Sequence, residues 1–185
     1  MINPLLADWQ TPFALAPFDH ICDDDFAPAF ETAMNEARAE VVAIAENPEP
    51  ATFANTIEAL ECSGATLDKV LSVFFTLSGA DSNPRRQELQ RDFGPRLAAY
   101  SSELYGNKAL FARVETLWQA RDDLGLSAEE DRLLILTHRA FRRAGAALTG
   151  DAEDRMRVIM ARLSELGTAF TQNLLADEAG WHMEL

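Results

Sequence analysis

After residue 22, apolar residues recur at three- and four-residue steps, and this spacing constrains the fold more than any other feature. The first run comprises Phe26, Phe30, Ala33, Ala37, Val41 and Ile44. Because an α-helix completes a turn every 3.6 residues, such spacing gathers these side chains on one face. No strong alternation of apolar and polar residues predicts a strand, and no repeat has a fixed period. The sequence therefore predicts an all-α fold, a multi-helix antiparallel bundle-like domain of about six to seven helices.

Capping residues and prolines mark where the helices begin and end. The carboxylates of Asp23–Asp25 can accept hydrogen bonds from the unpaired N–H groups of a helix start, with metal binding as the alternative. Thr52 can cap a second helix, Ser127 opens a capping box, and Asp151 opens the last long helix. Pro95 would cost a helix about 3 kcal/mol, so we expect a kink or a break near residue 94.

Residues 1–22 are interpreted as an extended, proline-rich arm. Pro4, Pro12 and Pro17 interrupt the segment, and a proline within a helix removes a hydrogen bond and clashes with the preceding turn. The arm also contains large apolar residues that need a surface to pack against, namely Trp9, Phe13, Leu15 and Phe18. We expect the arm to clasp the helices or another domain.

Negative charge is concentrated in the first half of the chain. Residues 1–84 carry fourteen acids against Arg38 and Lys69, whereas residues 85–185 carry sixteen acids against fourteen bases. With a net charge of −14, the chain lacks the basic face that binds nucleic acids, and its acidic half would be repelled by anionic lipids. We therefore expect no nucleic-acid or membrane partner. The acidic half either solubilises the protein or steers cationic peptides toward a cleft.

The beginning of the chain differs from a secretory signal. It has no basic n-region and no long apolar h-region, and no apolar run approaches the ~18 residues of a membrane span. A cytoplasmic location is the default expectation. Cys22 and Cys62 lie far apart and fit no metal-binding spacing, so we expect Cys62 to be a buried free thiol.

The histidines do not form a catalytic motif. They are His20, His138 and His182, and none belongs to His-Glu-x-x-His, which places two zinc ligands and a general base on one helix. We therefore assign no catalytic, cofactor-binding or metal-binding residue to this segment. His138 is interpreted as a packed or half-exposed helix residue, and His20 as an ordinary hydrogen-bonded side chain.

One basic cluster could bind an anion. It consists of Arg139, Arg142 and Arg143, and each planar guanidinium can bond a carboxylate through two N–H groups. The cluster could hold a peptide carboxyl group. Pairing with the acidic side chains of this protein itself is the favoured interpretation.

Two other groups of residues have both a functional and a structural interpretation. Glu36 and Glu40 stand one helical turn apart, and we interpret them as solvated surface rather than as a general acid–base pair. Phe74, Phe75 and Trp118 could line a peptide channel, but their helical spacing is more typical of a core.

Several phrases, in a fixed order, carry a family resemblance. Early in the chain they are Asn3-Pro-Leu-Leu6, Thr52-Phe-Ala-Asn-Thr-Ile-Glu-Ala-Leu-Glu-Cys-Ser-Gly64 and Val73-Phe-Phe75. Later they are Phe111-Ala-Arg-Val-Glu-Thr-Leu-Trp-Gln-Ala-Arg121, Leu124-Gly-Leu126 and Gln172-Asn-Leu-Leu-Ala176. Together they resemble the N-terminal helical region of the M3 (thimet oligopeptidase-like) zinc metallopeptidases. The resemblance is greatest to the bacterial peptidyl-dipeptidases, or dipeptidyl carboxypeptidases, and next to oligopeptidase A-like enzymes.

The resemblance implies a function for the parent enzyme. In this family a zinc ion, held by the two histidines of His-Glu-x-x-His and a downstream glutamate, polarises the scissile carbonyl and activates water. The resemblance places those residues beyond Leu185, so the segment should be inactive alone. It also implies that residues 23–178 form one wall of a channel for short, unstructured peptides. The parent enzyme would release C-terminal dipeptides.

A missing catalytic domain would leave a trace on this segment. We expect residues 179–185 to begin a linker or strand toward that domain, and an exposed apolar patch to mark where it docks. Through the same patch, the isolated segment could form a homodimer. The alternative function is a stand-alone helical protein-interaction module, which predicts a finished surface and a stable monomer.

Overall fold

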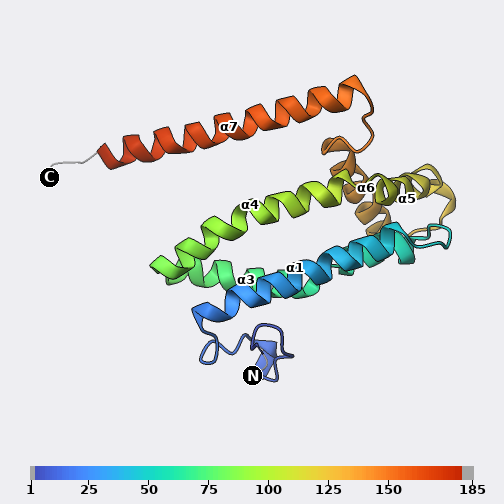
Figure 1. Ribbon diagram of the computed structural model, residues 1–185. Coiled ribbons are helices and arrows are strands. Elements are labelled where there is room, and N and C mark those ends of the chain that lie inside the picture. Colours follow the sequence, from blue (N-terminus) through green and yellow to red (C-terminus); the bar gives the residue numbers. More distant parts are fainter. Residues whose placement is uncertain (1–2, 181–185) are drawn as a thin grey trace. The chain divides into compact units, whose positions relative to one another are not determined.

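The computed structural model describes residues 3–180, and helices are the only regular secondary structure among them (Figure 1). The all-α prediction is confirmed. The chain divides into two compact units, residues 1–146 and residues 147–185. The first unit contains α1 (Asp23–Ala45), α2 (Ala59–Cys62), α3 (Ala65–Ala80), α4 (Pro84–Gly106), α5 (Lys108–Gln119) and α6 (Ala128–Arg143). It also contains the short turns η1 (Pro12–Ala14), η2 (Phe53–Glu58) and η3 (Arg121–Asp123), and the second unit contains α7 (Asp151–Gly180).

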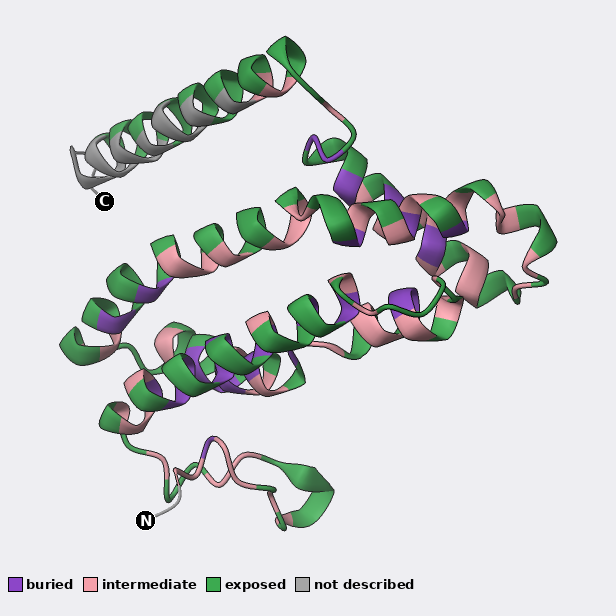
Figure 2. Ribbon diagram, turned by 45° about the vertical axis from the view of Figure 1, so that its right-hand side comes forward, coloured by how far each residue is buried: buried purple, intermediate pink, exposed green. Residues whose placement is uncertain are grey.

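Helix α1 runs through two hydrophobic clusters of the first unit (Figure 2). Its N-terminal part packs with α3 and α4, where the Phe30 ring stacks on the Phe93 ring with centroids 3.7 Å apart. Its C-terminal part packs with η2, α5 and α6 around the buried side chains of Ile57 and Phe141. Every member of the predicted apolar face of α1 is buried, which confirms the helical period of these residues.

Side chains cap the helices where the sequence predicts. The Thr52 hydroxyl accepts a hydrogen bond from Asn55 N at 3.1 Å, and Ser127 forms the expected capping box at the start of α6. At the start of α1, the Asp25 carboxylate accepts from Cys22 N at 2.7 Å. The Asp23 carboxylate instead accepts from Arg86 Nε at 2.7 Å, which ties the start of α1 to the start of α4. The capping interpretation is confirmed for Asp25, whereas Asp23 and Asp24 pair with arginines at the start of α4 and so join two helices.

Helix α4 continues through Pro95, so of the two expected outcomes near residue 94 the break is wrong, and the kink stays a prediction. Proline removes only one backbone hydrogen bond and lies here at an exposed position. On either side of it, Phe93 is buried and Leu97 packs against the same cluster. These contacts stabilise the helix on both sides of the proline and offset the local cost.

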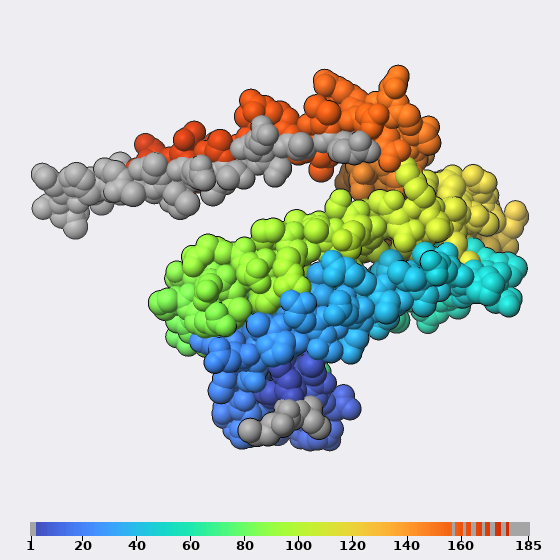
Figure 3. Space-filling view, viewed as in Figure 1, coloured from blue at the N-terminus to red at the C-terminus, as the bar shows by residue number. Residues whose placement is uncertain are grey.

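The N-terminal arm packs against the helices of the first unit through Trp9, which was expected, and through Leu5, which was not (Figure 3). Leu5 is fully buried, and Lys69 Nζ donates to Ala7 O at 2.9 Å. Trp9 packs against the cluster and donates through Nε1 to Pro4 O at 2.9 Å. Three side chains of the arm do not pack on the helices and remain exposed, so their packing against another domain stays a prediction, namely for Phe13, Leu15 and Phe18.

Both cysteines are free and exposed, so the expected burial of Cys62 is wrong. Cys62 ends α2, which comprises only four residues and follows the π-helical turn η2. A π-helix contains more residues per turn than an α-helix, so the direction of later side chains departs from the 3.6-residue pattern. Among the described residues, no helix combines the length and the apolar character needed to cross a membrane.

Helix α7 begins at Asp151, as predicted, and extends to Gly180. Residues 179 and 180, expected to belong to a linker or strand, are therefore helical, whereas residues 181–185 lie outside the described residues. Apolar side chains at steps of three and four residues form an exposed stripe on this helix, in which Phe170 is 70% exposed. The other exposed members are Ile159, Met160, Leu163, Leu166 and Leu174.

Candidate functional site

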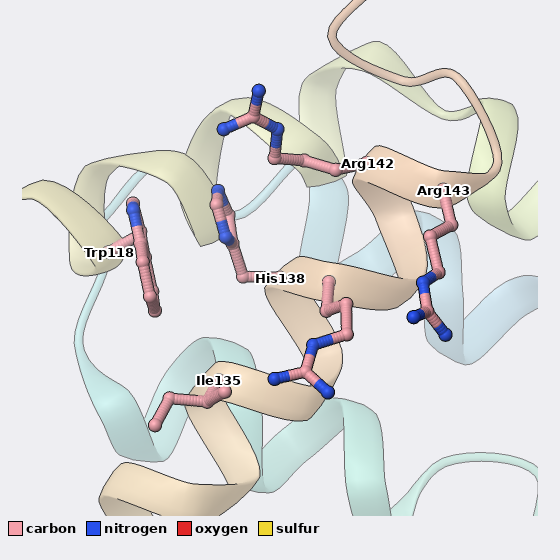
Figure 4. A pocket seen from close by; sticks show the side chains of 6 residues that line it. Trp118, Ile135, His138, Arg142 and Arg143 are labelled. Atoms are coloured by element: carbon pink, nitrogen blue, oxygen red, sulfur yellow. The ribbon is translucent and has the colours of Figure 1, made fainter.

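A pocket of about 350 Å³ lies where α5 and α6 pack against each other (Figure 4). Helix α5 contributes Trp118, and α6 contributes Ile135, His138, Arg139, Arg142 and Arg143. The sequence of α6 explains why a histidine reaches this position. His138 shares one helical face with the buried side chains of Leu134 and Phe141, so packing of that face carries the imidazole toward α5.

The His138 ring is buried, with 4% exposure, and lies between helices as part of an aromatic stack. Its centroid is 4.2 Å from that of Trp118, and the two planes differ by 7°. The Phe111 ring follows with its centroid 6.2 Å from the imidazole and an interplanar angle of 17°. The prediction of a packed helix histidine is confirmed.

A carboxylate satisfies the polar edge of this histidine. His138 Nε2 lies 2.8 Å from Glu115 Oε2, and Gln119 Nε2 donates to the other carboxylate oxygen at 3.1 Å. The hydrogen bond with His138 holds the pKa of the Glu115 carboxyl below its usual range, and the positive charge of Arg142 acts in the same direction. Glu115 thus remains ionised and oriented, and it fixes the imidazole against Trp118.

The three arginines of the pocket are exposed and have no acidic partner within salt-bridge distance among residues 3–180. Pairing with the acidic side chains of the protein, the favoured interpretation from the sequence, is therefore wrong for the described part of the chain. Arg142 and Arg143 belong to the last turn of α6, where cations oppose the negative end of the helix dipole. Their placement stabilises the helix end and leaves their N–H donors available.

The remaining candidate residues lie either on the surface or in the core. His20 is exposed, and its Nε2 atom lies 3.5 Å from Asp19 Oδ2. Phe74 is a core residue whose ring packs edge-on against Phe26, while Phe75 is partly exposed. His182 lies outside the described residues.

Glu40 has a structural role that the sequence did not suggest. Its carboxylate accepts a hydrogen bond from Gly64 N at 2.6 Å and so fixes the beginning of α3 against α1. Gly64 has φ +76°, a left-handed conformation that glycine adopts without strain. Glu36 is exposed, in agreement with its interpretation as surface.

The chemistry of the pocket is that of anion binding. Its donors are guanidinium groups, and its apolar walls are Ile135 and Trp118. Within the part of the chain that the structure describes, no three His, Cys, Asp or Glu side chains come together as a metal site. Sequence reasoning found the three arginines but missed the aromatic wall, because the contact between α5 and α6 cannot be read from either helix alone.

The sequence of this helical chain is similar to segments of known peptidases. It is 41% identical over 174 residues to the dipeptidyl carboxypeptidase of Salmonella typhimurium (strain LT2), a match that covers 94% of this chain. The dipeptidyl carboxypeptidase of Escherichia coli (strain K12) is 40% identical over 95% of this chain. Oligopeptidase A of the same Escherichia coli strain is 28% identical over 98% of it.

The family resemblance is thereby confirmed. The chain matches M3 peptidases over nearly its whole length, and it matches the dipeptidyl carboxypeptidases more strongly than oligopeptidase A. It spans 26% of the length of each of these relatives. No family model matches the chain.

Proposed function

We propose that this chain is the N-terminal helical domain of an M3 zinc metallopeptidase and forms one wall of the channel that admits short peptides. The observation that carries the proposal is the 41% identity to a dipeptidyl carboxypeptidase over 94% of the chain. The parent enzyme would act in the cytoplasm and release C-terminal dipeptides. The lower identity to oligopeptidase A, 28%, favours this specificity over that of an oligopeptidase.

In this proposal the chain supplies no catalytic group of its own. The described histidines, His20 and His138, engage Asp19 and Glu115, and the sequence contains no His-Glu-x-x-His. Zinc and the general base would come from the remainder of the longer polypeptide. The relatives are about four times as long as the matched segment, which leaves room for such a domain.

The exposed face of α7 supports docking of that domain. Ile159, Leu163, Leu166, Phe170 and Leu174 follow one another at steps of three and four residues, so they form a single apolar stripe. Contiguous exposed apolar surface marks an interaction site, and covering one such side chain is worth about 1.5–3 kcal/mol. We assign this stripe to the interface with the catalytic domain.

A segment exchange tests the proposed function. The matching segment of Escherichia coli dipeptidyl carboxypeptidase would be replaced by this chain, and release of dipeptides from a blocked tetrapeptide would be measured. The enzyme with the segment deleted is the control. We expect the exchanged enzyme to bind zinc and release dipeptides, and the isolated 185-residue chain to release none with or without zinc. A folded, zinc-loaded exchange enzyme without activity would refute the proposal.

A further inference from the structure

We propose that the pocket on α6 binds a carboxylate group of a peptide, with Arg139 and Arg142 as its donors. This inference rests on the proposed function, because it names the part of the peptide that this domain recognises. The carboxylate could be the free C-terminus of the peptide or the side chain of an aspartate or glutamate in it. Both sources present the same planar, bidentate acceptor to a guanidinium.

Three positive charges line the pocket. The chain has thirty acidic residues against sixteen lysines and arginines, and several described arginines pair with a carboxylate of the protein itself. Arg38, Arg86 and Arg96 do so, at 2.9, 2.7 and 2.7 Å from their carboxylates. The three arginines of the pocket have no such ion pair with the described residues, although they stand within five positions of one another. An anion from outside would relieve their mutual repulsion.

The acidic side chain on which Arg142 acts through its charge is already engaged. Glu115 receives hydrogen bonds from His138 and Gln119, and it influences Arg142 only through its charge. Guanidinium donors therefore line the pocket, whereas the Glu115 carboxylate does not line it and faces a different partner. Because Glu115 is held in this way, it leaves the donors of Arg139 and Arg142 to a ligand.

The walls of the pocket provide a place for the rest of a peptide. In Figure 4 the Trp118 and His138 rings stand face to face, with the Arg142 side chain extending toward the imidazole. Ile135 adds an aliphatic surface, and the volume of about 350 Å³ falls at the lower end of the range for small-molecule sites. A carboxylate beside an apolar or aromatic side chain is the ligand that matches these groups.

The position of the arginines at a helix end has a structural explanation that must be separated from binding. Cations in the last turn of α6 oppose the helix dipole and stabilise the helix without any ligand. That explanation predicts that substitution of these arginines slightly lowers the stability of the protein, and that the pocket binds no ligand. It does not account for Arg139, which precedes the last turn, or for the apolar wall beside it.

Calorimetric titration of the 185-residue chain with three blocked tripeptides tests the inference. The first is an acetylated tripeptide ending in phenylalanine as the free acid, the second is its C-terminal amide, and the third is an amide with one internal aspartate. The variants are Arg139→Gln, Arg142→Gln and, as the matched control on the exposed surface of the same helix, Arg132→Gln. Circular dichroism of each variant establishes that α6 has kept its helical content.

We expect the free acid to bind and its amide to bind at least tenfold more weakly, since a charge-assisted hydrogen bond is worth more than one order of magnitude in Kd. Arg139→Gln and Arg142→Gln should each weaken binding of the acid by roughly tenfold, and Arg132→Gln should leave it unchanged. Binding should also weaken as the salt concentration rises. The aspartate peptide separates the two sources: its binding equals that of the acid if any carboxylate suffices, and falls to that of the amide if the C-terminus is required.

Equal affinity of acid and amide in the folded chain would overturn the inference, and so would binding that survives both arginine substitutions. Absence of any binding by the folded chain would overturn it as well. The segment exchange described above tests the proposed function separately from the pocket. Dipeptide release that is unaffected by Arg142→Gln would refute the pocket while sustaining the peptidase, and carboxylate binding without dipeptide release would do the reverse.

Discussion

Replacement of Phe30 by alanine is the most direct test of the packing on which the first unit depends. Phe30 lies on α1 and is fully buried. Its ring stacks on Phe93 with centroids 3.7 Å apart and meets Phe74 edge-on at 5.6 Å. Phe13, in the N-terminal arm, is 96% exposed and offers the same chemical change without burial. The pair therefore isolates the contribution of packing.

The expected loss follows from the contacts that Phe30 makes. Truncation of a buried phenylalanine to alanine costs about 3–5 kcal/mol through lost transfer energy and the cavity that remains. Each favourable aromatic pair adds about 0.5–1.5 kcal/mol beyond the buried area. With one stacked and one edge-on partner, Phe30→Ala should fall at the upper end of that range. Phe13→Ala should change the free energy of unfolding by no more than about 0.5 kcal/mol.

Urea unfolding followed by circular dichroism at 222 nm measures both free energies. The midpoint of Phe30→Ala should shift far below that of the unsubstituted chain while the slope remains similar, since a changed slope would mean a changed unfolded or native state. A loss below about 1 kcal/mol for Phe30→Ala, or equal losses for the two variants, would refute the assignment of Phe30 to the core.

Further predictions concern one ion pair, one titrating group and one exposed helix. Arg86→Ala should lower the free energy of unfolding by about 2 kcal/mol, because the Arg86 side chain is 12% exposed and its loss leaves the Asp23 carboxylate without its charged partner. Arg85→Ala is the control: this side chain is 44% exposed, and its replacement should leave the urea midpoint unchanged. The lowered pKa of Glu115 means that its ionised form stabilises the fold. This contribution is present above the unfolded pKa of about 4.3 and is lost as the pH falls through the folded pKa. Glu115→Gln should therefore flatten the acid side of a stability-versus-pH profile measured by thermal unfolding. Leu163→Glu should leave the thermal unfolding of the isolated chain unchanged, since Leu163 is exposed, but should reduce dipeptide release by the exchanged enzyme; unchanged release would contradict the docking role of α7.

Local rules predicted most of the fold because they act over a few residues. The apolar period of α1 and the caps at Thr52 and Ser127 depend on neighbours within one or two helical turns, and the structure confirms each of them. The failures occurred where distant contacts decide the outcome. Packing on both sides of Pro95 keeps α4 continuous, and Leu5 rather than Phe13 anchors the arm because only Leu5 meets the cluster.

The candidate site was only half visible in the sequence for the same reason. Arg139, Arg142 and Arg143 are close in sequence, so a cluster could be predicted. Whether acidic residues would neutralise it depends on how the helices pack, and the described residues contain no such ion pair. The stack of Trp118 on His138 joins residues twenty positions apart on two helices, a contact for which neither sequence segment carries a signal.

The coding sequence beyond the codon for Leu185 offers the most direct test of the claim that this chain is part of a zinc peptidase. We predict an open reading frame that encodes His-Glu-x-x-His, followed by a glutamate that completes the zinc site. A stop codon directly after Leu185 would contradict the account, and it would leave a helical interaction module as the function to test.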